Sequence, residues 1–325
     1  MALKKRRKLK VKNFIIFIII ILIVIYAFFK ATSFVYKLIF VKNETVTTKE
    51  KESKKKATKK DIIEPIDSLK LKYQKLDNIN EKIDFFINDN IDRYIKYKEK
   101  HTNLSNEQVV VNVNIGLDND YYTNTKPAIN LNTNYILVNK YNSLSKDYEP
   151  DNLKSIDKKY SIDGMRMVNY AKEAFEEMSK DALKEKMHII AMSTYRSYNY
   201  QVNLFNKYAK KDGLEAANTY SAKAGFSEHQ TGLAVDVYNG TVNYTSFEKT
   251  KEFNWMTENA YKYGFILRFP KDKENETGYK YESWHYRYVG KEIAEYIHNE
   301  KISFEEYYVR FIENKEKKYR LVNKK

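Results

Sequence analysis

The chain has 325 residues, a formal net charge of +15 at pH 7 and no cysteine. Disulfide bonds and thiolate metal ligands are therefore excluded, and any metal site must use histidine, aspartate or glutamate. The positive charge does not predict binding to nucleic acid, because it is concentrated at one end. Residues 1–60 contain 17 Lys and Arg against 3 acidic residues, whereas the rest of the chain contains 41 against 40.

An uncharged apolar run, residues 14–29, follows the basic segment 4–12. Sixteen helical residues span about 24 Å, which is shorter than the ~30 Å hydrocarbon core of a bilayer. Extension to Tyr36, with Lys30 reaching toward the headgroups, closes this gap. The basic flank favours a cytoplasmic N-terminus, and no A-x-A-like cleavage site follows the run. We expect a cytoplasmic tail at 1–13 and one transmembrane anchor at 14–36 that contacts lipid, with everything downstream outside the cytoplasm.

The region after the anchor changes in composition. Residues 37–66 are polar and rich in Lys and Thr, which is typical of a disordered stalk. Residues 67–132 are predicted to precede the core with a charged helical part and then a strand and turn at 107–124. Another strand leading into an irregular segment is predicted at 134–153.

From residue 161 onward the pattern becomes more regular. Apolar residues at helical spacing predict helices, and short apolar or alternating runs predict strands. The helices are expected at 161–180, 198–213 and 253–263, and the strands at 187–193, 233–237, 265–269 and 281–290. Because no βαβ unit repeats, we expect an α+β domain at 133–312, followed by a basic tail at 313–325.

Five polar residues stand out against this framework. His229 precedes a strand that carries Asp236, and Glu282 and His285 lie together near the C-terminal end, while Arg196 follows a buried strand. Taken alone, a histidine in a loop is usually a hydrogen-bonding residue, and an acid in a strand can face solvent. Together, two imidazoles and a carboxylate are typical of a catalytic zinc site with a fourth position for water. A separate carboxylate can take the proton of that water, and an arginine can hold a substrate carboxylate.

The spacing of the last two residues imposes a condition. A separation of three places Glu282 and His285 on opposite faces of a regular strand, so both reach one metal only at a bend or strand end. Among the other histidines, His188 is expected to be packed in a buried strand, whereas His101 and His298 are expected to face solvent.

The stretches "STYRSYNYQ", "SEHQTGLAVDV" and "ESWHYRYVG" closely resemble the VanY-type D-alanyl-D-alanine carboxypeptidases of the M15 metallopeptidase family. Their patterns Y-R-S, S-x-H-x6-D and E-x-W-H occur together and in order. The resemblance extends over roughly residues 93–312. It implies the M15 or Hedgehog-like peptidase fold, in which a small, mostly antiparallel sheet flanked by helices carries a zinc site.

The resemblance also implies a role for each matching residue. It implies one zinc ion per chain, with His229, Asp236 and His285 as ligands and Glu282 as the general base. The positions that match the family's contacts to the C-terminal carboxylate and backbone of the substrate are Arg196, Gln201 and Ser227.

These implications predict a membrane-anchored D,D-carboxypeptidase at the surface of a bacterial cell, which removes the C-terminal D-alanine from peptidoglycan stem peptides. An L,D-carboxypeptidase that trims tetrapeptide stems looks similar and remains an alternative. A non-catalytic wall-binding module on the same fold is disfavoured because Glu282 and the three ligands are intact. An added scaffold role for residues 61–106 remains open, and the sequence does not indicate an oligomeric state.

Overall fold

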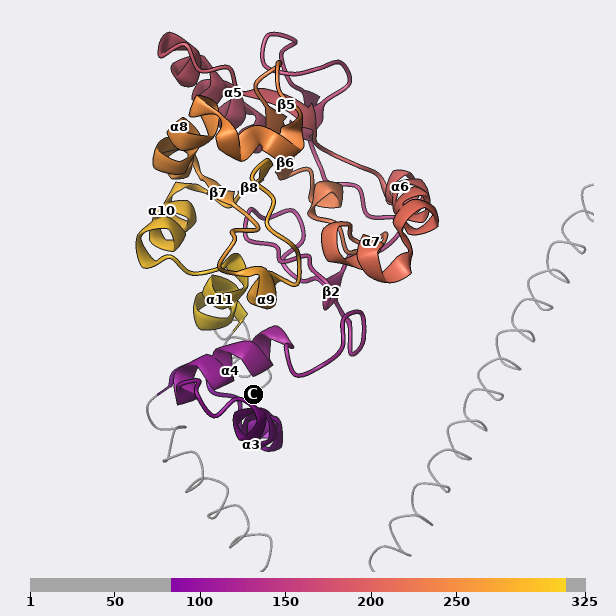
Figure 1. The fold of residues 1–325 in the computed structure, drawn as a ribbon, viewed down its shortest axis with the longest axis vertical. Coiled ribbons are helices and arrows are strands. Elements are labelled where there is room, and N and C mark those ends of the chain that lie inside the picture. Colours follow the sequence, from indigo (N-terminus) through magenta and orange to yellow (C-terminus); the bar gives the residue numbers. More distant parts are fainter. Residues whose placement is uncertain (1–82, 314–325) are drawn as a thin grey trace, which may run out of the picture. The chain divides into compact units, whose positions relative to one another are not determined.

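The computed structural model describes residues 83–313 (Figure 1). The predicted basic tail, anchor and stalk lie outside these residues, as does the C-terminal tail beyond Glu313. Within the described part, no helix is both long and apolar enough to cross a bilayer. The domain boundary predicted at residue 132 stays a prediction.

A four-stranded antiparallel sheet forms the centre of the domain. Its strand order is β5 (Ile190–Ser193), β6 (Ala234–Tyr238), β8 (His285–Tyr288) and β7 (Phe265–Leu267). Each strand overlaps a range predicted from the sequence, and the α+β class is confirmed. The register places Asp236 of β6 opposite His285 of β8.

The main hydrophobic core packs one face of this sheet against helix α5 (Asn169–Lys184). Phe175 of α5 is fully buried, and so are Val235 and Val237 of β6. Burying a side chain of this kind contributes about 1.5–3 kcal/mol. Because side chains alternate along a strand, Asp236 points to the opposite face from its two valine neighbours. The apolar core therefore determines which way the carboxylate points.

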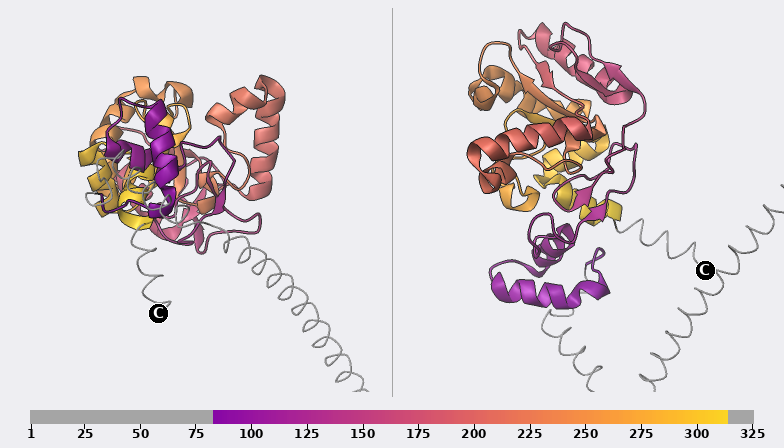
Figure 2. Two further views of the ribbon diagram at one scale, coloured as in Figure 1. Left: turned by 90° about the horizontal axis from the view of Figure 1, so that it is seen from below. Right: turned by 90° about the vertical axis from the view of Figure 1, so that its right-hand side faces the viewer.

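Further helices surround the sheet (Figures 1 and 2). Helix α8 (Lys251–Asn259) and the 3-10 turn η5 (Ala260–Tyr263) add apolar residues to the same core, and Gly264 ends them. The pair α6 (Tyr198–Asp212) and α7 (Leu214–Tyr220) lies to one side of the sheet. Helices α10 (Lys291–Glu300) and α11 (Phe304–Tyr307) contribute to a second hydrophobic cluster. Helix α11 continues into the π-helical turn η6 (Tyr308–Glu313). A short helix, α9 (Glu274–Thr277), precedes β8.

The strand predicted within 107–124 is wrong, because this segment is helix α4 (Asn106–Ile115). Its β-branched valines suggest a strand, but Ser105 and Gln108 form a capping box that starts a helix. The valines of α4 are buried against α3 (Ile91–Lys100), which follows the 3-10 turn η2 (Asn88–Asn90). Tertiary packing thus outweighs the intrinsic preference of valine.

The strand predicted within 134–153 is also wrong. Apart from β2 (Asn142–Ser143), which pairs with β1 (Lys126–Pro127), and Leu153 at its end, this stretch is irregular although Ile136 is fully buried. Side chains satisfy its backbone in place of a strand partner: Arg287 donates to the carbonyl of Ile136. The sequence contains no local sign of this distant partner.

The beginning of α5 also differs from the prediction. Residues 166–168 of the expected helix form β4 (Arg166–Val168), which pairs with β3 (Leu153–Ser155), so the helix begins only at Asn169. His188 precedes β5 and is exposed, which makes its predicted burial wrong. His101 and His298 are exposed, as expected.

Gly232 joins the predicted ligand-bearing turn to β6, and its backbone is left-handed with φ of +69°. A Cβ atom here would lie 2.9 Å from Leu153 Cδ2 and 3.1 Å from Val168 Cγ2. We expect Gly232→Ala to lose about 1–2 kcal/mol through backbone strain and a further ~1–3 kcal/mol through overpacking. The free energy of unfolding in urea measures this loss.

Gly164→Ala is the matched control, because Gly164 has φ of +83° but no atom within 4 Å of an added Cβ. It should show the strain without the overpacking. Equal losses in the two variants would contradict the proposed contact with Leu153 and Val168.

Candidate metal and catalytic site

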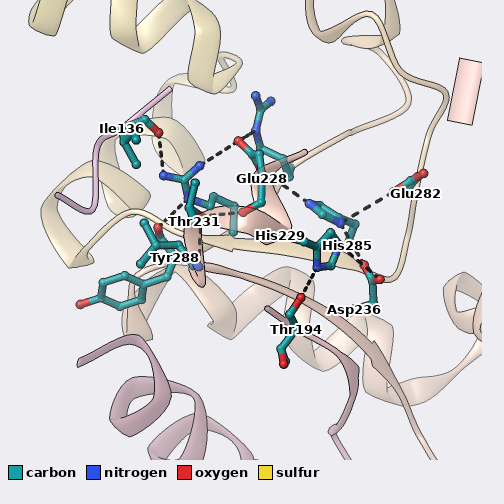
Figure 3. A network of polar contacts seen from close by, with 12 residues as sticks. Ile136, Thr194, Glu228, His229, Thr231, Asp236, Glu282, His285 and Tyr288 are labelled. Atoms are coloured by element: carbon teal, nitrogen blue, oxygen red, sulfur yellow. Dashed lines mark hydrogen bonds and ion pairs between the residues drawn. The ribbon is translucent and has the colours of Figure 1, made fainter. Parts of the chain in front are cut away.

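Among the predicted site residues, His229, Asp236, Glu282 and His285 lie close together (Figure 3), and Arg196 contacts Asp236. Arg196 lies in the loop after β5, and His229 lies in the 3-10 turn η3 (Glu228–Thr231). Asp236 is the middle residue of β6, and His285 is the first residue of β8. The loop and the turn are joined directly, since the backbone N–H of Arg196 donates to the carbonyl oxygen of His229 at 3.1 Å.

His229, Asp236 and His285 form a compact buried cluster. One potential ligand atom from each side chain lies within 4.8 Å of the other two. Ligands around a tetrahedral zinc at about 2.0–2.2 Å stand roughly 3.3–3.6 Å apart. The 3.4 Å between His229 Nε2 and Asp236 Oδ2 falls in this range. Two imidazoles and one carboxylate, with ligand atoms all within 4.8 Å of one another, are a set of donors that suits zinc.

The ring of His229 is oriented by the backbone. Its Nδ1 lies 2.7 Å from the carbonyl oxygen of Thr194, and since a carbonyl only accepts, Nδ1 carries the proton and donates it. Nε2 therefore keeps its lone pair and points toward Asp236. Burial, aided by the positive charge of Arg196, lowers the pKa of His229 to about 4. At neutral pH this imidazole is therefore uncharged, as a histidine that binds a metal must be.

Asp236 contacts both histidines of the cluster and Arg196. Its Oδ1 lies 2.9 Å from Nδ1 of His285, and its Oδ2 accepts a hydrogen bond of 2.6 Å from Nη2 of Arg196. Burial raises the pKa of Asp236, but His229 and Arg196 outweigh this effect and lower the pKa well below its usual range. The carboxylate is therefore ionised whenever the protein is folded near neutral pH.

His285 contacts carboxylates on both sides of its ring. Nδ1 faces Asp236, and Nε2 lies 3.6 Å from Oε2 of Glu228. Burial lowers the pKa of His285, but the contacts with Asp236 and Glu228 raise it to about 9. Without a metal the ring is protonated at neutral pH, and a metal ion would take the place of the proton on one nitrogen.

Glu282 lies just before β8, in a turn where its carbonyl oxygen accepts the backbone N–H of His285 at 3.2 Å. This bend meets the geometric condition for both side chains to reach one point. Oε2 of Glu282 lies 3.9 Å from Nδ1 of His285. Burial, together with the negative charge of Asp236, raises the pKa of Glu282 to about 8. A carboxyl group tuned in this way can both accept and return a proton near neutral pH.

Arg196 lies against the cluster and is partly exposed. Its Nη2 donates to Asp236, and its Nε donates to Oγ of Ser193 at 2.9 Å. A bidentate grip on a substrate carboxylate through these nitrogens therefore requires Arg196 to exchange Asp236 for the substrate. The guanidinium group already lies next to the predicted reaction centre.

Gln201 and Ser227, the other two predicted substrate residues, are both buried. Nε2 of Gln201 donates to the carbonyl oxygen of Ala222 at 2.8 Å, and its Oε1 has no hydrogen-bond partner among residues 83–313. Ser227 directly precedes η3, and its carbonyl oxygen accepts the N–H of Gln230. Ser227 therefore lies beside the turn that carries His229. Gln201 is hydrogen-bonded to the loop that precedes this turn.

Sequence reasoning missed a buried ionic network behind His285. Arg268 and Arg287 both donate to Oε1 of Glu228 at 2.8 Å, and Arg268 also donates to both carboxylate oxygens of Glu305. Burial raises the pKa of Glu228, but the two arginines outweigh this effect and lower the pKa below its usual range. The only sequence signal was that charged residues interrupt apolar runs in "FSEHQ", "FILRF" and "HYRYV".

Comparison with known proteins adds independent information. The profile of a family described as "VanY: D-alanyl-D-alanine carboxypeptidase" matches residues 164–291, a range that contains every site residue predicted from the sequence. YodJ of Bacillus subtilis (strain 168), which is named as a carboxypeptidase, is 37% identical over 226 residues, covering 66% of this chain and 83% of that protein.

Two further proteins are similar to this chain. A D-alanyl-D-alanine carboxypeptidase of Enterococcus faecium is 40% identical over 136 residues, which cover 42% of this chain and 41% of that protein. The solved structure of the LD-carboxypeptidase LdcB has a TM-score of 0.54 and 37% identity, covering 59% of this chain and 94% of that one. The LdcB structure reveals the molecular basis of peptidoglycan recognition by that protein.

Proposed function

Because the chain belongs to the VanY family of D-alanyl-D-alanine carboxypeptidases, we propose that it is a zinc-dependent D,D-carboxypeptidase. Its substrate is the peptidoglycan stem peptide that ends in D-Ala-D-Ala, from which it removes the terminal D-alanine. The observation that carries this proposal is the buried cluster of His229, Asp236 and His285 with Glu282 beside it.

His229, Asp236 and His285 would hold one zinc ion per chain, through two imidazoles and one carboxylate. When bound, zinc supplies Lewis acidity, which activates water as the nucleophile and polarises the scissile carbonyl. Three protein ligands leave a coordination position open, whereas a fourth would close it. Glu282 is therefore assigned to proton transfer and not to the metal.

Glu282 takes the proton of the attacking water on its carboxylate and then gives it to the leaving amine of D-alanine. Its burial next to the cluster supports this role, because a carboxyl group with a raised pKa is a better base than an exposed one. Arg196 is suited to hold the terminal carboxylate of the substrate, which would restrict cleavage to the last residue. Ser227 and Gln201 are assigned to the substrate backbone on the resemblance alone.

The metal assignment predicts one zinc ion per chain, and loss of activity with a chelator. His229→Ala, Asp236→Ala and His285→Ala should each lose zinc at concentrations that saturate the unmodified chain, because each removes one of three protein ligands. His298→Ala is the control, since His298 is exposed and should leave the zinc content unchanged. Normal zinc content in one of the three variants would remove that residue from the ligand set.

The function predicts release of D-alanine from a pentapeptide stem, detected by mass spectrometry. Glu282→Gln is nearly isosteric and cannot accept the proton, so we expect zinc to be retained while kcat falls by roughly 10²–10⁴. Metal content and turnover are measured on the same preparation. Loss of zinc together with activity would instead make Glu282 a ligand.

The same assay with a tetrapeptide stem tests the alternative. The similarity to LdcB, an LD-carboxypeptidase, favours L,D-cleavage as the second candidate. Turnover of the tetrapeptide in place of the pentapeptide would establish it. Binding without turnover of either peptide would indicate a wall-binding module.

The exopeptidase role of Arg196 predicts dependence on a free C-terminal carboxylate. Arg196→Lys keeps the positive charge but loses the planar fork, so kcat/KM should fall while zinc content is retained. A substrate with an amidated C-terminus should be cleaved far more slowly than the free acid by the unmodified chain. Equal rates for the two substrates would contradict the role of Arg196.

We also propose that residues 14–36 anchor the chain in the bacterial membrane with the catalytic domain outside. The apolar run and its basic flank support this location. The full-length chain should stay in the membrane fraction during high-salt washing. Protease added to wall-stripped cells should digest the domain, and complete protection would place it on the cytoplasmic side.

A further inference from the structure

Glu228 connects the predicted metal cluster to the ionic network behind it (Figure 3). It is the first residue of η3 and directly precedes His229 in the chain. Its two carboxylate oxygens face different partners: Oε1 accepts from Arg268 and Arg287, whereas Oε2 points toward Nε2 of His285. Glu228 is therefore placed between the two arginines and a predicted ligand.

The contact between Glu228 and His285 involves two buried atoms that each lack another partner. Within residues 83–313, neither Oε2 of Glu228 nor Nε2 of His285 forms any hydrogen bond. They lie 3.6 Å apart, which is slightly longer than a hydrogen bond. Unpaired polar atoms are costly in a protein interior, and a hydrogen bond between these two would satisfy both.

Building on the zinc site proposed above, we propose that Glu228 is a positioning residue for the metal. It accepts the Nε2–H of His285, and this fixes the imidazole in the tautomer whose Nδ1 lone pair faces the metal position. Metal-binding histidines commonly donate their second ring N–H to a carboxylate in this way. His229 is oriented in the opposite sense, because its Nδ1–H donates to the carbonyl oxygen of Thr194 and leaves Nε2 for the metal.

The two arginines explain why the carboxylate of Glu228 can hold this position. Both arginines are fully buried. Arg268 directly follows β7, and Arg287 lies in β8. Arg287 also donates to the carbonyl oxygens of Asn134 and Ile136, and Arg268 is held by Glu305. Because both guanidinium groups are themselves restrained, Oε1 of Glu228 is anchored and Oε2 has a defined direction.

A purely structural role for Glu228, as the counter-ion of two buried arginines, is the competing explanation. Glu228→Gln separates the two. The glutamine can keep an acceptor oxygen toward the arginines, but its amide then presents N–H groups to Nε2 of His285. That arrangement favours the tautomer with the proton on Nδ1, which cannot bind a metal through that atom.

Glu305→Gln is the matched control. Glu305 is as buried as Glu228 and shares Arg268 with it, so its variant also removes one carboxylate charge from the network. The hydrogen bonds and ion pairs of Glu305 go to residues other than His285. Both variants should therefore lower thermal stability, but only one should affect the metal.

The experiment measures the zinc dissociation constant of the purified full-length chain by competition with a chromophoric chelator. Glu228→Gln should raise this constant by roughly 10–100-fold, the usual effect of losing such a partner, and Glu305→Gln should leave it unchanged. An equal change in both variants would overturn the proposal. If the unmodified chain binds no zinc, the proposed metal site itself fails, and the inference fails with it.

A second measurement does not depend on the folding of any variant. Long-range proton–nitrogen NMR correlations of the unmodified chain, labelled at its five histidines and loaded with zinc, report which ring nitrogen carries the proton. We expect the proton on Nε2 of His285 and on Nδ1 of His229. A proton on Nδ1 of His285 would overturn the proposal.

Discussion

The antiparallel pairing of β6 with β8 is the constraint on which the site depends, because it sets Asp236 directly opposite His285. Strand β6 also buries Val235 and Val237 on its other face, against α5. A slip of one residue would turn the carboxylate into the apolar core and the valines toward the histidines. Core packing and site geometry are therefore stabilised together.

The polar face of the sheet is stabilised by pairing its buried charges. Asp236 contacts Arg196 and both histidines, while Glu228 and Glu305 share Arg268. Unpaired charges would be expensive in this interior. One side of His285 thus faces the predicted metal cluster, and the other faces an ionic network that ties η3, β8 and α11 together. The network places rigid support directly behind a predicted ligand.

Local patterns predicted most of the elements that carry the site. The strand at Asp236 and the helix α6 are found where the spacing of apolar residues placed them. Prediction failed at two segments: in one, a local capping signal and helix packing outweigh the β-branched pattern, and in the other a distant partner decides the conformation. The valines of α4 are helical because Ser105 starts a helix and α3 covers its apolar side chains. The backbone at Ile136 is irregular because Arg287, 151 residues away in the chain, satisfies its carbonyl oxygen.

By itself, the sequence determined which residues could form a metal and acid–base site, because cysteine is absent and only histidine and carboxylate side chains remain. It also indicated that Glu282 and His285 could meet only at a bend. The tertiary structure decided which nitrogen of each histidine faces Asp236, and that Arg196 contacts this carboxylate. It alone placed Glu228 behind His285. These features depend on side-chain directions set by strand register and by buried partners far apart in the chain, which no local pattern encodes.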